Sequence, residues 1–221
     1  MANNNSTLKQ TSVAVCAFAT LFSLFTTANS QANEFDNLKV VQIYSQEELI
    51  GWINNNTHLT RVKEDRCQLV EDIEARAQIV KTPAYQFLWG DMLAWGVCVD
   101  KNPELGLYYM QQAAHQGLPG ALEQLGRYYA NGILVQQDDK RAINYLREAA
   151  ALGHIKARVQ FAEYLDQGLG SPLDFEDAYH WLHNTVIADK KMHKRAEKAL
   201  ASLATKMPER LVEKAKRPEQ K

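Results

Sequence analysis

Cysteine, proline and glycine are scarce in this chain, which has 3, 6 and 11 of them among 221 residues. So few cysteines exclude a disulfide-rich scaffold, and so little proline and glycine excludes collagen-like and low-complexity classes. Neither sign of charge dominates, because 25 Lys and Arg face 26 Asp and Glu. With that balance and no recognised nucleic-acid motif, the sequence argues against nucleic-acid binding.

Catalytic motifs are missing as well. The chain has no G-x-S-x-G, P-loop or G-x-G-x-x-G pattern. Its best metal-like cluster is Asp177, His180 and His183, with His193 further on. The two histidines six residues apart point well away from each other on a helix, and the H-E-x-x-H spacing is lacking. We therefore expect surface or half-buried histidines, no metal, no cofactor and no catalytic residue.

The chain does contain an internal repeat, which occurs three times at an offset of 36 residues without gaps. A period of this length is typical of stacked supersecondary units, each too small to bury its apolar face alone. The main equivalent positions are Gly90, Gly126 and Ala162; Gly96, Gly132 and Gly168; Gly106, Ala142 and Ala178; Tyr109, Tyr145 and Trp181.

Each repeat predicts a pair of helices. In the second repeat, Ala121, Leu125 and Tyr129 form one helical face, and Gly132 ends that helix. Asp138 or Asp139 can cap the next helix, which Gly153 ends. By the same pattern, Pro103 opens the second helix of the first repeat, and Asp174 can cap that of the third. The expected fold is an all-α solenoid of helix pairs.

Residues 1–30 have the pattern of an export signal. Lys9 is their only charged residue, and the apolar run 13–25 is short for a membrane span. Cleavage is expected after Ser30, with Ala32 as the alternative position; the other interpretation is an uncleaved anchor helix.

Removal of this signal leaves two cysteines, Cys67 and Cys98. In an exported chain they predict one disulfide, which would link a helix over residues 61–80 to the turn of the first repeat. A disulfide also argues against either cysteine as a nucleophile. The alternative is two buried free thiols.

The chain between the signal and the repeats, residues 31–82, does not follow the 36-residue pattern. Residues 45–48 (SQEE) predict a capping box that opens a helix through Ile53, which residues 54–56 break. The predicted helix 61–80 has an apolar stripe, and we expect the segment to cap the stack. Its stripe consists of Cys67, Val70, Ile73, Ala77 and Val80.

Residues 190–221 are basic, with 11 Lys and Arg against 4 Glu, whereas residues 31–189 have 13 against 22 Asp and Glu. An apolar stripe in this segment predicts a terminal pair of capping helices, with a break between them near Pro208. This pair follows the repeats of residues 83–189. The charge fits either a solvated outer face or a dock for an acidic partner or an anionic surface. The stripe consists of Leu200, Leu203, Met207 and Leu211.

The repeat register also places side chains in columns along the first helices, which line the concave side of helix-pair solenoids. One column is Met92, Tyr128 and Tyr164, and its neighbour begins at Trp95. Aromatic and Met side chains are frequent at interaction hot spots, so these four residues are the candidate partner-binding residues. Ordinary core packing is the alternative.

The pattern A-x-x-x-L-G-x-x-Y-x-x-G, followed by D-x-x-A-x-x-Y-L-x-x-A-A-x-x-G, resembles the Sel1-like branch of the tetratricopeptide solenoids over residues 84–188. This resemblance implies a protein-binding scaffold.

A more specific resemblance includes the segment outside the repeats. The runs IYS, WINNN, DRCQLV, YQFLWGDMLAWGVCV, LYYM and LEQLGRYYA resemble the MotX family of periplasmic flagellar motor proteins, over about residues 40–215. The resemblance implies a non-enzymatic adaptor of the flagellar basal body. Its implied partners are MotY, in the T ring, and the periplasmic part of PomB-type stator subunits. It also implies that the two remaining cysteines are bonded. A general periplasmic Sel1-like scaffold, or less readily a cell-wall enzyme, is the alternative.

Overall fold

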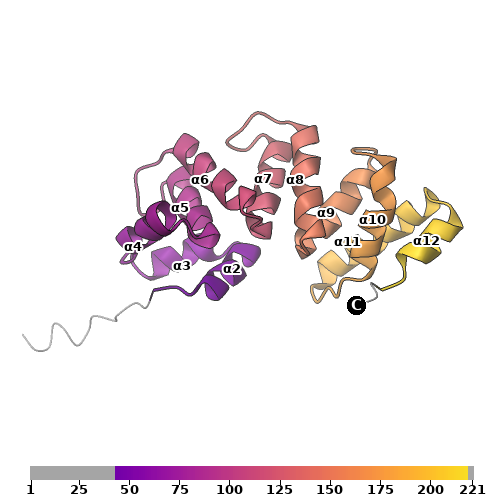
Figure 1. Ribbon diagram of the computed structural model, residues 1–221, viewed down its shortest axis with the longest axis horizontal. Helices are drawn as coiled ribbons and strands as arrows, with labels where there is room; N and C mark the ends of the chain where they lie inside the picture. Colours follow the sequence, from indigo (N-terminus) through magenta and orange to yellow (C-terminus); the bar gives the residue numbers. More distant parts are fainter. Residues whose placement is uncertain (1–42, 219–221) are drawn as a thin grey trace, which may run out of the picture. The chain divides into compact units, whose positions relative to one another are not determined.

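The computed structural model describes residues 43–218, in which helices are joined by turns and loops and there is no strand (Figure 1). The prediction of an all-α fold is therefore confirmed. The expected export signal and both of its cleavage positions lie outside the described residues.

The N-terminal helices are α2 (Gln46–Asn55), α3 (His58–Glu64), α4 (Val70–Ala75) and the π-helix η1 (Arg76–Val80). They pack on the first helix of the repeats. The predicted capping box is confirmed, since the Ser45 hydroxyl accepts the Glu48 N–H and the Glu48 carboxylate accepts the Ser45 N–H. Asn56 ends α2 in the left-handed conformation.

The prediction of one continuous helix over residues 61–80 is wrong. Arg66 and Cys67 adopt φ of 54° and 60°, which an α-helix cannot contain, and they separate α3 from α4. The buried positions are consequently Val62, Leu69, Ile73 and Ala77, while Val80 is 65% exposed.

The three repeats form α5 (Pro83–Trp95) and α6 (Pro103–His115), α7 (Pro119–Asn131) and α8 (Asp139–Ala151), and α9 (Ile155–Asp166) and α10 (Phe175–His183). The short 3₁₀ helix η2 (Pro172–Asp174) precedes α10. Because α5 and α7 begin and end at the same repeat positions, the 36-residue register is kept in three dimensions.

The predicted helix ends are largely as expected. Gly132 ends α7 with φ of 65°, and the Asp138 carboxylate accepts the Arg141 N–H at the start of α8. The predicted cap by Asp174 is wrong, because its side chain caps no helix and instead accepts the Arg147 Nε–H at 2.9 Å.

Two glycines bring the helices of the first pair into close approach. A Cβ on Gly106 of α6 would lie 2.5 Å from the Gly90 carbonyl oxygen and 2.7 Å from the Ala94 nitrogen of α5. The backbones of α5 and α6 therefore touch where neither residue has a side chain.

The C-terminal helices are α11 (Lys190–Thr205), which packs on α9 and α10, and α12 (Glu209–Ala215), which packs on α10. The chain breaks at Pro208 between them, as predicted. Of the predicted apolar stripe, Leu203 is buried and Leu200, Met207 and Leu211 are half-buried. Ala196, Ala199, Val212 and Ala215 form the rest of the buried side.

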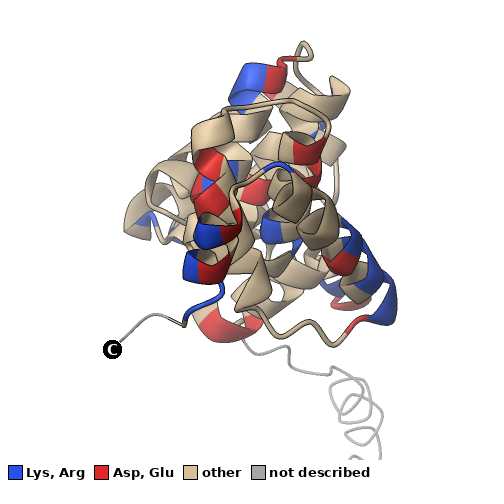
Figure 2. Cartoon of the chain, turned by 90° about the vertical axis from the view of Figure 1, so that its right-hand side faces the viewer, with Lys and Arg blue, Asp and Glu red and all other residues tan. Residues whose placement is uncertain are grey.

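Three basic residues of the C-terminal segment are paired with acidic residues of the third repeat. The ion pairs are Arg195 with Glu163 at 2.6 Å, Lys206 with Asp166 at 2.7 Å and Lys214 with Glu176 at 2.6 Å. Basic and acidic positions accordingly alternate over this side of the molecule (Figure 2).

Candidate protein-interaction surface

Cys67 and Cys98 are joined by a disulfide in the structure. Cys67 lies in the turn between α3 and α4, and Cys98 lies in the turn between α5 and α6. Both have positive φ, at 60° and 63°. The bond thus attaches the N-terminal helices to the first repeat.

The four candidate partner-binding residues have different environments. Met92 is fully buried and Tyr128 is 1% exposed, so interpreting these two as contact residues is wrong; they belong to the core. Trp95 is 44% exposed and Tyr164 is half-buried. For Trp95 and Tyr164, partner binding stays a prediction.

Tyr128 organises a buried polar network instead. Its hydroxyl oxygen accepts hydrogen bonds from Trp95 Nε1 at 3.0 Å and Gln124 Nε2 at 2.6 Å, and its hydroxyl lies 3.3 Å from Asp91 Oδ1. Asp91 Oδ2 in turn lies 2.6 Å from His58 Nε2. Burial raises the pKa of Tyr128, which keeps the phenol protonated. The network links α3, α5 and α7 and fixes the exposed indole of Trp95.

A groove of about 310 Å³ lies between α7, α9 and α11. Its lining consists of side-chain amides with charged and aromatic residues around them. Amides both donate and accept hydrogen bonds, as the backbone of an extended peptide does. The lining residues are Arg127, Asn131, Gln160, Glu163, Tyr164, Gln167 and Arg195.

The sequence interpretation missed the two arginines of this groove. The repeat contained one signal for them, since Arg127 and Glu163 are charged residues at equivalent positions 36 residues apart. Arg127 lies 3.4 Å from Glu123, and Arg195 forms a two-contact pair with Glu163. Both are therefore held in place at the groove, where their charge favours an acidic partner.

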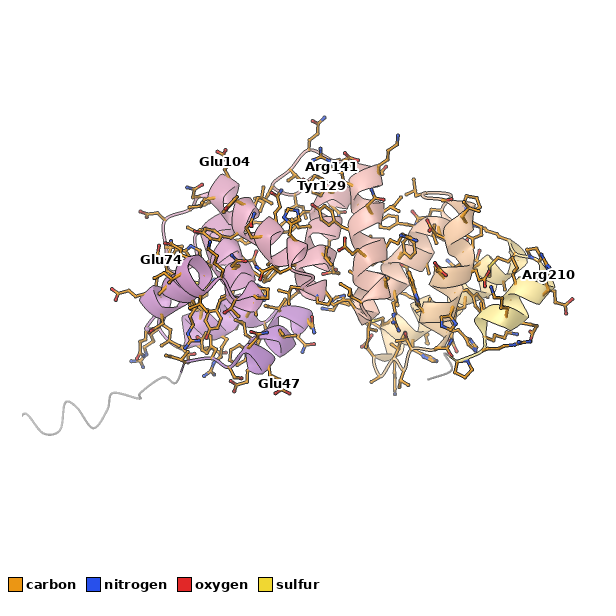
Figure 3. All side chains as sticks on the ribbon, viewed as in Figure 1. Glu47, Glu74, Glu104, Tyr129, Arg141 and Arg210 are labelled. Atoms are coloured by element: carbon orange, nitrogen blue, oxygen red, sulfur yellow. A yellow bond between two sulfur atoms is a disulfide. The ribbon has the colours of Figure 1, made fainter. Side chains whose placement is uncertain are left out.

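An aromatic cluster lies where α7 ends and α8 begins, and Figure 3 shows Tyr129 and Arg141 side by side there. The Arg141 guanidinium lies 5.4 Å from the Tyr129 ring and donates to its hydroxyl at 3.3 Å. That hydrogen bond raises the pKa of Arg141. Tyr145 stacks on Tyr129 with ring centroids 5.7 Å apart.

The histidines of α10 and α11 do not converge. His180 Nδ1 lies 2.9 Å from the Ala215 carbonyl oxygen, His183 stacks on Tyr179, and His193 lies 3.3 Å from Glu197. Within residues 43–218, no group of three His, Cys, Asp or Glu side chains has a geometry that could hold a metal ion.

The stacked helix pairs define the class of protein. Residues 83–118, 119–154 and 157–184 match the family model described as Sel1 repeat, so the chain contains three Sel1 repeats. Over 199 residues it is 55% identical to the sodium-type polar flagellar protein MotX of Vibrio parahaemolyticus serotype O3:K6 (strain RIMD 2210633). The alignment covers 90% of this chain and 94% of that protein, and the chain therefore belongs to the MotX family.

Solved structures resemble the fold. A Sel1 repeat protein from Oxalobacter formigenes aligns with a TM-score of 0.51 and 23% identity, over 58% of this chain and 97% of its own. A protective antigen of uropathogenic Escherichia coli with an SLR fold aligns with a TM-score of 0.45 and 22% identity, over 61% of this chain and 28% of its own. Among the helices of residues 43–218, none has both the length and the hydropathy that a bilayer crossing requires.

Proposed function

We propose that this protein is a non-enzymatic structural adaptor of the polar flagellar motor, located in the periplasm at the basal body near the outer membrane. It binds MotY in the T ring and the periplasmic part of PomB-type stator subunits. By holding the stators in place it supports torque generation and therefore motility.

The observation that carries this proposal is the similarity to MotX over 90% of the chain, which includes the non-repeat helices as well as the repeats. Sel1-type stacks are protein-binding scaffolds, and this one presents a groove of amides, arginines and Tyr164. The groove is suited to an extended, acidic segment of a partner, and the exposed Trp95 of α5 is a further candidate contact. The predicted export signal supports the periplasmic location.

A general periplasmic scaffold is the second candidate, because the Sel1 repeat by itself is shared by proteins of many roles. The two candidates differ in what the loss of the gene does. The motor adaptor is required for rotation, whereas a general scaffold leaves rotation intact.

The test is deletion of the gene, with filaments counted by electron microscopy and swimming scored separately. We expect paralysed cells with normal filaments, restored to swimming by the same gene on a plasmid. Normal swimming in a strain without a second copy of the gene would contradict the proposal.

The same strain tests the groove. Asn131→Glu places a carboxylate in the groove, where it repels an acidic segment. The matched control is Gln136→Glu, at an exposed residue of the α7–α8 loop that does not line the groove. We expect slow swimming for Asn131→Glu and wild-type speed for Gln136→Glu, at equal protein levels.

A further inference from the structure

A cavity of about 360 Å³ lies apart from the groove, where three segments distant in the sequence meet. These segments are the end of α2, the turn between α8 and α9, and the loop that leads into α11. A hydrogen bond of 2.5 Å from the Lys156 ammonium to the Asn54 carbonyl oxygen joins two of its sides. The volume is that of a small-molecule or single-residue site rather than of a broad interface.

His154, on the wall of this cavity, is 7% exposed. Its Nδ1 accepts the Ala157 N–H at 3.3 Å, so Nδ1 has no proton of its own. Burial lowers the pKa of His154, and the neutral ring must then have its proton on Nε2. Within residues 43–218 that Nε2–H has no acceptor, which leaves one donor on the cavity wall available to a ligand.

Further donors surround this imidazole. His154 is the N-cap of α9, a helix of 12 residues, and Ile155 and Lys156 are the first two residues of that helix. Their N–H groups have no acceptor inside the helix, and the helix dipole adds partial positive charge at this end. The arrangement is typical of a carboxylate or other anion site.

The remaining lining combines apolar side chains with the amides of Asn54 and Asn55 and the carboxylate of Asp189. Ile155, Ile187 and Met192 line the cavity, and Ile155 is 41% exposed. Asp189 caps α11 through Oδ1, which accepts the Met192 N–H at 2.7 Å. Its other carboxylate oxygen can accept a hydrogen bond from a ligand.

We infer that this cavity binds the C-terminal residue of a partner protein chain. Such a residue has one carboxylate for His154 and the first turn of α9, one N–H for Asp189, and one aliphatic side chain for Ile155, Ile187 and Met192. No other single protein residue offers these three groups together. Exposed Lys190, Lys191 and Lys194, beside the cavity at the start of α11, favour an anionic chain end. This inference rests on the proposed function only in requiring a protein partner.

The test uses the mature chain, ¹⁵N-labelled, and an N-acetylated tetrapeptide ending in leucine, either as the free acid or as the amide. We expect the free acid to shift the backbone resonances of residues 153–156 and 187–192. The amide should bind at least about tenfold more weakly, because it removes the charge that the donors recognise.

Two matched variants locate the site. Ile155→Glu puts a carboxylate into the first turn of α9, which suits the helix but repels an anionic ligand. The control is Leu105→Glu, which is similarly placed in the first turn of α6, is 39% exposed and lies away from the cavity. We expect Ile155→Glu to reduce peptide affinity about tenfold or more and Leu105→Glu to leave it unchanged.

Four results would each overturn the inference. They are equal binding of acid and amide, an equal loss of peptide affinity in Ile155→Glu and Leu105→Glu, resonance shifts confined to other residues, and no shift at millimolar peptide. His154→Asn checks the donor, because Asn preserves the cap but removes Nε2–H. It should weaken binding of the acid more than binding of the amide, because the hydrogen bond to a charged carboxylate is the stronger one; unchanged binding of the acid would also overturn the inference. These binding results are independent of the deletion phenotype, so failure here leaves the proposed motor role standing.

Discussion

At the scale of single residues, Tyr128 connects the N-terminal helices to the repeats through hydrogen bonds rather than through partner contact. Its hydroxyl is shared among Trp95, Gln124 and Asp91, and the last of these also contacts His58. All but Trp95 are buried, so each polar atom depends on the others for satisfaction.

Replacement of Tyr128 by Phe preserves the ring and removes the hydroxyl. We expect a loss of about 1–3 kcal/mol in the free energy of unfolding, because buried Asp91 Oδ1 and Gln124 Nε2 lose a partner. Urea unfolding followed by circular dichroism measures the loss. Tyr164→Phe is the control, since Tyr164 is half-buried and its hydroxyl has no hydrogen bond within the described residues. Equal stability of the two variants would contradict a structural role for the network.

The sequence predicted which residues share a repeat position but not all of their environments. Met92, Tyr128 and Tyr164 are equivalent at the 36-residue offset, yet the first two are buried and the third is half-buried. Burial at this column depends on the neighbouring helices. The N-terminal helices pack on α5, and nothing in the repeat pattern predicts how far they extend over it. The cavity beside His154 was missed for a related reason, because it is built from three segments that no spacing rule connects.

At the scale of helices, α5 and α6 approach each other closely at Gly90 and Gly106. The repeat already indicated small residues at these positions. Gly90 is equivalent to Gly126 and Ala162, and Gly106 is equivalent to Ala142 and Ala178. The structure adds that the Gly106 site has no room even for a methyl group.

Gly106→Ala should therefore destabilise the protein although Ala favours helices. The added Cβ would lie 2.5 Å from the Gly90 carbonyl oxygen, so the two helices must separate, at a cost of about 1–3 kcal/mol. Gly51→Ala in α2 is the matched control, because no atom lies within 4 Å of its added Cβ. That variant should gain about 0.5–1 kcal/mol from helix propensity alone. Thermal unfolding gives the midpoint of each variant. A Gly106→Ala variant more stable than the unaltered protein would show that the packing of α5 on α6 does not depend on this contact.

Helix prediction succeeded where periodicity and end signals agree and failed where a long-range bond sets the backbone. The helices of the second repeat were predicted from apolar spacing, Gly132 and Asp138. The break at Arg66 and Cys67 was not, because neither residue type favours positive φ and the predicted apolar stripe of that helix includes Cys67. At that break Cys67 is bonded to Cys98, a residue 31 positions away in the sequence.

At the scale of the whole described molecule, the stack depends on nearest-neighbour contacts, and its first helices are held by the disulfide as well as by packing. Cys67→Ser or Cys98→Ser opens a loop of 31 residues. In the chain-entropy model this loss is about 3–4 kcal/mol at 25 °C. Because the unfolded chain is then no longer cross-linked, we expect a lower unfolding midpoint and less protein in the periplasm. The double variant should match each single variant, because all three lack the same bond. Unchanged protein levels and unchanged motility in both single variants would show that the disulfide does not contribute to the stability of this stack.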